Sequence, residues 1–180
     1  MRILASALCV LAVIVAVPAV AEEQAADPWA AVRFMVGAWE GKAEGRAGDG
    51  TVSRRYEFVL GQRFLHERNT STYPPQERNR KGEVHEHWSF ISYDRARKVL
   101  VLRQFHIEGF VNQYSFSPDE SGPGRLVFQS EGFENLGSKW RAKETYQILG
   151  PDEFTETFEL APPDKPFEAY GKNHFKRVRP

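Results

Sequence analysis

Polar residues interrupt otherwise apolar alternations at several places in the sequence. Glu144, for example, lies two residues from Ala142 on one side and from Tyr146 on the other. Alternate residues of a β-strand share one face, so each such polar residue is expected among apolar neighbours. A charge buried without a partner is strongly unfavourable, so the pattern indicates internal ion pairs or a cavity that accepts water or a ligand. The residues of this kind are Arg54, Glu86, Arg103, Asn112, Tyr114, Glu144 and Glu156.

An aromatic residue and a histidine complete the predicted lining of a binding cavity. Trp88 is the next residue after Glu86 on the same strand face. His106 lies in a stretch with a high polar content for a strand and turn, and could reach the mouth of a cavity beside Gln104. Two alternatives remain: ion pairs inside a filled barrel, or strands on which the inner and outer faces are exchanged.

Two other histidines have a spacing that suits a metal ion. His85 and His87 are two residues apart, so on a strand their rings share a face and could supply two imidazole ligands. Glu83 lies on the same face. The opposite face, with Val84 and Trp88, is more apolar and is therefore expected to point inward. On that interpretation His85 and His87 are solvent-exposed residues rather than ligands.

Signatures of several enzyme classes are missing from the sequence. It contains no G-x-S-x-G elbow, no glycine-rich phosphate loop and no H-E-x-x-H motif. A single histidine without a partner nucleophile is not a catalytic constellation, although histidine is a frequent acid or base near neutral pH. Binding is therefore favoured. The alternatives are an enzyme that uses cavity carboxylates with His106, and a ligand-free structural or interaction barrel.

Residues 1–21 have the features of a signal peptide. A basic residue is followed by an apolar run, and the segment ends in an A-x-A site at Ala21. The apolar run is shorter than the roughly 18 residues that a membrane span requires. We expect a signal peptide over 1–21, a disordered start over 22–27, one β-barrel domain over 28–180, and a periplasmic or secreted product.

The cysteine and charge content argues against several roles. The single cysteine, Cys9, lies within the predicted signal peptide, so the mature domain would have no disulfide and no thiolate metal site. The 24 basic residues balance 24 acidic ones, and the two signs are interspersed along the chain. Proteins that bind nucleic acid carry a basic surface, so nucleic acid is not an expected partner.

From Gly37 onward the sequence has a period of two. β-branched and aromatic residues alternate with polar ones between clusters of Gly, Pro, Asp and Asn, which is typical of strands joined by tight turns. An open sheet of this size would expose two edges. We therefore predict an all-β, closed, antiparallel up-and-down barrel of about eight to ten strands, with a two-sheet sandwich as the alternative. The strands are expected near 37–46, 51–60, 63–72, 83–92, 98–106, 109–117, 125–133, 138–148, 153–160 and 167–178.

The segment before the first strand has helix-start chemistry. An aspartate at position 27 can act as N-cap, and Pro28 suits the first helical position, so a short helix through Met35 is predicted. Trp39 should lie in the first strand where this helix meets the barrel. Glycine inside a strand marks close backbone approach or a sharp bend, which is the role predicted for Gly37, Gly41 and Gly45 around Trp39.

Residues 34–45 read FMVGAWEGKAEG. This segment resembles the opening L-L-G-x-W-x-G-x-G of the nitrobindin-like haem-binding barrels, which are calycin-type folds akin to lipocalins and fatty-acid-binding proteins, and of a related bacterial family of unknown function. Later features, such as 61–65 and 91–94, follow in a similar order. The resemblance implies a small, largely apolar ligand: haem, a lipid or an aromatic metabolite. Nitrobindins hold haem on a histidine near the last strand, and the nearest candidate here is His174.

Overall fold

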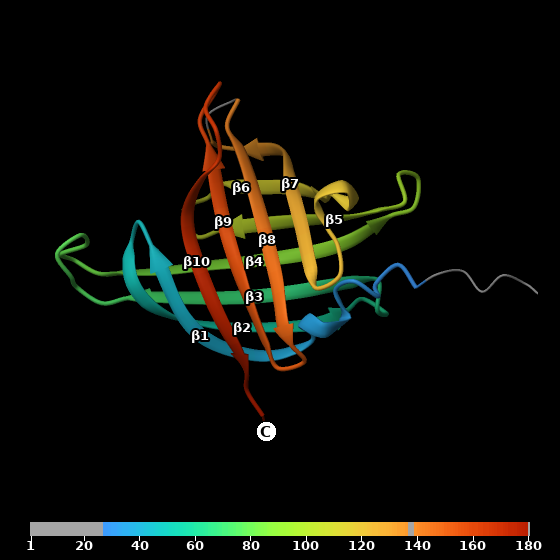
Figure 1. Cartoon of the computed structure of the whole chain (residues 1–180), viewed down its shortest axis with the longest axis horizontal. Helices are drawn as coiled ribbons and strands as arrows, with labels where there is room; N and C mark the ends of the chain where they lie inside the picture. The colour runs from blue at the N-terminus through green and yellow to red at the C-terminus, as the bar shows by residue number, and fades with distance from the viewer. Residues whose placement is uncertain (1–26, 137–138, 180) are drawn as a thin grey trace, which may run out of the picture.

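The computed structural model describes residues 27–136 and 139–179, whose strands form one closed antiparallel barrel (Figure 1). The ten strands follow one another around the barrel in chain order, and β10 closes onto β1. The predicted all-β closed barrel is therefore confirmed over the sandwich alternative. The strands are β1 (Gly37–Gly45), β2 (Gly48–Val59), β3 (Phe64–Tyr73), β4 (Glu83–Asp94), β5 (Val99–His106), β6 (Val111–Phe116), β7 (Arg125–Glu134), β8 (Arg141–Gly150), β9 (Glu153–Ala161) and β10 (Glu168–Arg177).

The predicted signal peptide lies outside the described residues, as does the expected start of the mature chain up to residue 26. The segment that follows contains turns and a single turn of 3-10 helix, η1 (Arg33–Met35). The helix predicted through Met35 is not confirmed beyond that turn. Among the residues described, no helix is long and apolar enough to cross a membrane.

Residues 27–36 close one end of the barrel, here called the capped end. Val32 and Met35 are fully buried there, and Trp29 packs edge-on against Phe58 of β2 with ring centroids 5.3 Å apart. The indole Nε1 of Trp39 donates a hydrogen bond to the carbonyl oxygen of Met35 at 2.6 Å. The first strand and the cap are therefore joined by packing and by a buried hydrogen bond.

Trp39 is buried, 1% exposed, as the sequence predicts for the start of β1. Its ring packs edge-on against Phe154, with centroids 4.7 Å apart, and the guanidinium carbon of Arg177 lies 4.1 Å from its centroid. Beside it, β1 approaches β10 so closely that a Cβ at Gly41 would overlap the carbonyl oxygen of His174. The close approach predicted at Gly41 is confirmed.

On β3 and β4, the side chains that face the barrel interior change from apolar to polar with distance from the capped end. Strand β3 leaves that end and β4 returns to it, so their paired residues sample successive layers of the interior. The first layer is aliphatic, and the next three are polar. From the capped end, the inward pairs are Leu65–Ile91, Glu67–Ser89, Asn69–His87 and Ser71–His85.

Candidate functional site

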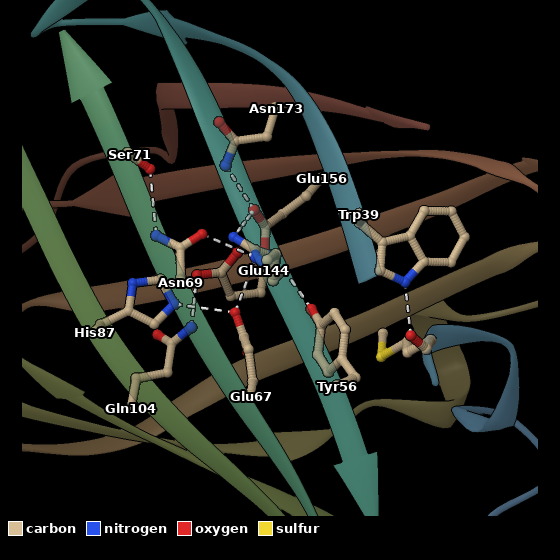
Figure 2. A network of polar contacts seen from close by, with 12 residues as sticks. Trp39, Tyr56, Glu67, Asn69, Ser71, His87, Gln104, Glu144, Glu156 and Asn173 are labelled. Carbon is tan, nitrogen blue, oxygen red and sulfur yellow. Dashed lines mark hydrogen bonds and ion pairs between the residues drawn. The ribbon is translucent and has the colours of Figure 1, made fainter. Parts of the chain in front are cut away.

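Arg54 of β2 is buried and bonded to several members of a network of polar side chains. Figure 2 labels its partners Glu67, Asn69 and Glu156. Its Nη1 and Nη2 donate parallel hydrogen bonds to the two carboxylate oxygens of Glu156 on β9, at 2.7 and 2.8 Å. Its Nε lies 2.9 Å from Glu67 Oε1 and 2.9 Å from Asn69 Oδ1, both on β3. A bidentate guanidinium–carboxylate pair fixes orientation as well as charge. Arg54 therefore holds β2, β3 and β9 together through the interior.

The second carboxylate of this network is held in its ionised form. Glu67 is 2% exposed, and it accepts a hydrogen bond at Oε1 from His87 Nε2 at 3.1 Å. Burial raises the pKa of Glu67, but the charge of Arg54 and the His87 hydrogen bond outweigh burial and lower the pKa to about 2. One guanidinium thus faces two carboxylates, those of Glu67 and Glu156.

Glu144 of β8 lies in the same interior without a cation of its own. It is 5% exposed, and its contact is the side-chain amide of Gln104, whose Nε2 donates to Oε1 at 3.4 Å. Burial, and after it repulsion from the Glu156 carboxylate, raise the pKa of Glu144 well above its usual value. The protonated carboxyl is favoured, and it is a potential hydrogen-bond donor inside the barrel.

Several inward polar atoms are buried without a hydrogen-bond partner among the described residues. The strand register aligns four of the residues that carry them in one row across β3, β4, β5 and β6. Buried polar groups are almost always hydrogen-bonded, so this row calls for ordered water or for polar groups of a ligand. The inward atoms are Glu67 Oε2, His87 Nδ1, Ser89 Oγ, Gln104 Oε1, Asn112 Oδ1 and Glu144 Oε2.

Three histidines gather in the layers farthest from the capped end. His85 and His87 lie on one face of β4, and His106 of β5 is paired directly with His87. One ring nitrogen of each histidine lies within 4.8 Å of one ring nitrogen of each of the others. The structure therefore places both histidines predicted as metal candidates on β4 next to a third.

Six of the nine residues predicted to line a cavity belong to the interior. Asn112 connects two of them, since its Nδ2 lies 3.2 Å from His106 Nε2 and donates to the Tyr114 hydroxyl at 3.0 Å. All six except His106, which is half-buried, are at most 5% exposed. They are Arg54, His106, Asn112, Tyr114, Glu144 and Glu156.

The other three predicted residues lie on the outer face, so those predictions are wrong. Glu86 and Trp88 are exposed, and Trp88 lies beneath the guanidinium of Arg68 at 5.0 Å. Arg103 donates to Gln113 Oε1 at 3.0 Å on the outside of β5. The error arises because large apolar residues occupy both faces of β4 and both faces of β5, so alternation alone does not identify the inner face of either strand.

The expected exposure of the β4 histidines is wrong for the same reason. His87 is 8% exposed and faces inward, and His85 is half-buried beside it. His174, the histidine that the nitrobindin resemblance indicates, lies on the outer face of β10, where its Nε2 is 2.7 Å from Glu153 Oε1. Its neighbours Asn173 and Phe175 face inward instead, so His174 cannot bind a ligand held inside the barrel.

Sequence reasoning missed a group of polar residues that complete the interior. The buried cation of Arg54 was a signal that inward acids must surround it, and Glu67 of β3 is one of these acids. The others reach the interior through a pairing register that no local pattern encodes. The missed residues are Glu67, Asn69, Ser71, Ser89 and Asn173.

No protein-family model and no curated protein matches the sequence. Among solved structures, the chain is similar to "Crystal Structure of Rv2717c from M. tuberculosis", with a TM-score of 0.61. The alignment covers 86% of this chain and 99% of that chain at 15% sequence identity. At that identity the likeness shows the fold alone, which in this chain is a closed barrel of ten antiparallel strands. Membership of the nitrobindin-like family or of the related bacterial family is not confirmed by it.

Proposed function

We propose that this chain is an exported binding protein whose barrel takes a small ligand with an apolar body and a hydrogen-bonding polar end. The observation that carries the proposal is the set of buried inward atoms without partners, next to an apolar layer at the capped end. Binding cavities characteristically combine apolar walls with a few directed polar atoms. The period-two alternation, the closed fold and the predicted signal peptide support the same role.

The unpartnered atoms favour a ligand that donates hydrogen bonds. Glu67 Oε2 and Gln104 Oε1 are acceptors. The interior has one guanidinium against two carboxylates, and both Nη atoms of Arg54 are already bonded to Glu156. An anionic ligand end would therefore meet repulsion rather than a free cation. A neutral alcohol or an amine fits these groups better than a fatty-acid carboxylate does.

Three probes test the proposal. They share the same aromatic ring system and differ in the polar end, which is an alcohol, an amine or a carboxylic acid. The alcohol and the amine are expected to raise the thermal midpoint and to bind in calorimetry, and the acid to bind more weakly. Gln104→Leu should weaken binding about tenfold, because one buried hydrogen bond is worth about 1 kcal/mol. Gln113→Leu, on the outer face of the adjacent strand β6, is the matched control and should bind like the unaltered protein.

Two results would contradict the proposal. One is equal binding by the Gln104→Leu and Gln113→Leu variants. The other is an interior filled by ordered water, with no effect of any probe on the midpoint, which would indicate the ligand-free structural barrel. Export is tested separately, by fractionation of expressing cells and by the mass of the mature chain, with cleavage expected after Ala21.

A further inference from the structure

The spacing of the histidine trio, His85, His87 and His106, suits direct coordination of a metal ion. His85 Nε2 and His106 Nδ1 are 3.3 Å apart. Two nitrogens at a zinc–nitrogen distance of about 2.05 Å and a tetrahedral angle are separated by about 3.3 Å. The third imidazole, that of His87, offers a nitrogen within 4.8 Å of both, so a side-chain rotation would bring it into the same sphere.

Each imidazole of the trio is also held by a side chain outside it. Histidine ligands of metal ions characteristically use their other ring nitrogen in this way, and the partner fixes the tautomer and the ring orientation. The partners come from β3, the β5–β6 connection and β6. The contacts are His87 Nε2 to Glu67 Oε1 at 3.1 Å, His85 Nδ1 to Glu108 Oε1 at 2.9 Å, and His106 Nε2 to Asn112 Nδ2 at 3.2 Å.

These partners leave His87 and His85 each with a lone pair on the other ring nitrogen. A neutral His87 that donates from Nε2 to Glu67 has its lone pair on Nδ1, and that atom is buried without a partner. A neutral His85 that donates from Nδ1 to Glu108 has its lone pair on Nε2, the atom nearest His106. An orphaned imidazole nitrogen on a side chain only 8% exposed is unfavourable unless something binds it.

The third histidine can reach the same state through its own partner. Rotation of the Asn112 amide would exchange its nitrogen and oxygen. The unpartnered Oδ1 would then accept from His106 Nε2 and from the Tyr114 hydroxyl, which frees His106 Nδ1 for a metal.

We propose that His85, His87 and His106 form a three-histidine site for a divalent transition metal, most simply zinc, at the end of the barrel opposite the cap. Neutral imidazoles suit zinc and similar divalent transition metals, and three protein ligands leave a fourth position for water or another group. The carboxylates of Glu67 and Glu108 stand behind two of the ligands and offset the charge of the ion. This site does not depend on the organic ligand proposed above.

The experiment is zinc titration of the chelator-treated protein by calorimetry, with cobalt absorption as a readout of geometry. We expect one zinc per chain and the intense visible bands of tetrahedral cobalt. His87→Gln and His106→Gln should each weaken zinc binding at least tenfold, and Glu108→Gln about tenfold to a hundredfold. The control is His174→Gln, which alters an exposed histidine on the outer face and should bind zinc unchanged.

Several outcomes would overturn the site. They are an absence of zinc binding, the weak bands of octahedral cobalt, and unchanged affinity in folded His87→Gln and His106→Gln variants, with folding checked by thermal midpoint. A second grouping, Glu83, His85 and Glu108, shares one histidine with the trio. Loss of binding in Glu83→Gln without loss in His106→Gln would assign the metal to that group and overturn the proposal. Zinc binding without binding of the aromatic probes would leave the site intact and contradict only the proposed function.

Discussion

Arg54 and Glu156 are 102 residues apart in the sequence and form a two-bond ion pair inside the barrel. Their strands, β2 and β9, are not neighbours, so the pair spans the interior instead of following the sheet. Because both Nη atoms are used in this pair, Arg54 acts as part of the scaffold. The groups left for the proposed ligand are then Glu144, Gln104 and the other buried atoms without a partner.

Removing one partner of this pair should be strongly destabilising. Arg54→Met leaves Glu67 and Glu156 buried without their cation, which typically costs about 3–5 kcal/mol. The double variant Arg54→Met/Glu156→Gln removes one of those orphaned charges and should recover part of the loss. Urea unfolding of the single and double variants measures the coupling. If the losses in unfolding free energy from the two substitutions simply added in the double variant, the coupling between Arg54 and Glu156 would be contradicted.

Glu144 should make the protein less stable as the pH rises. Its pKa is raised in the folded state, so folding favours the protonated form. The stabilisation that protonated Glu144 contributes is therefore fully present below pH 4.5, which is the pKa of the side chain in the unfolded chain. It is lost as the pH rises toward the folded pKa, by at most about 1.4 kcal/mol per pH unit. The charged side chains that act on Glu144 in the folded protein are those of Glu156, Arg54 and Glu67.

Glu144→Gln keeps the shape of the side chain without the ionisation, so it should remove that fall and be more stable than the unaltered protein near pH 8. The measurement is the free energy of unfolding in urea from pH 4 to pH 8. Glu159→Gln, on the neighbouring strand, is the control and should follow the original curve. Parallel curves for all three proteins would show that Glu144 does not titrate in this way.

Trp39→Ala should cost about 3–5 kcal/mol, as truncation of a large aromatic residue in a core does. The substitution removes the edge-on contact with Phe154 and the donor to the Met35 carbonyl. Trp88→Ala is the matched control, since Trp88 is 51% exposed on the outer face, and a loss below about 1 kcal/mol is expected. Similar thermal midpoints for the two variants would be inconsistent with this assignment.

Gly41→Ala tests how the barrel closes. A methyl group there would overlap the His174 carbonyl and push β10 away from β1, at a cost of about 3 kcal/mol. Gly132→Ala in β7 is the control, because a Cβ at Gly132 has no neighbour within 4 Å. Hydrogen exchange should report faster exchange of the β1 and β10 amides in Gly41→Ala alone. Equal protection in both variants would refute the close approach.

Strand number, order and direction could be predicted from the sequence, because their signals are local. Period-two alternation marks each strand, and short turns such as 150–152 force consecutive strands to pair antiparallel. The inward positions of Glu144 and Glu156 were also predictable. Their flanking residues on the other face of the strand, such as Lys143 and Thr155, are polar, so the buried face of β8 and β9 is unambiguous.

The inner face of β4 was decided only by the tertiary structure. Trp88 and Phe90 are apolar and the adjacent His87 and Ser89 are polar, yet the face that carries Trp88 and Phe90 is the outer one. A strand has only two faces, so a shift of one residue in its pairing with β3 exchanges every side chain between them. The pairing of Leu65 with Ile91 sets that register, and it brings His87 beside Glu67 and His106. Such contacts join residues distant in sequence, and no local pattern encodes them.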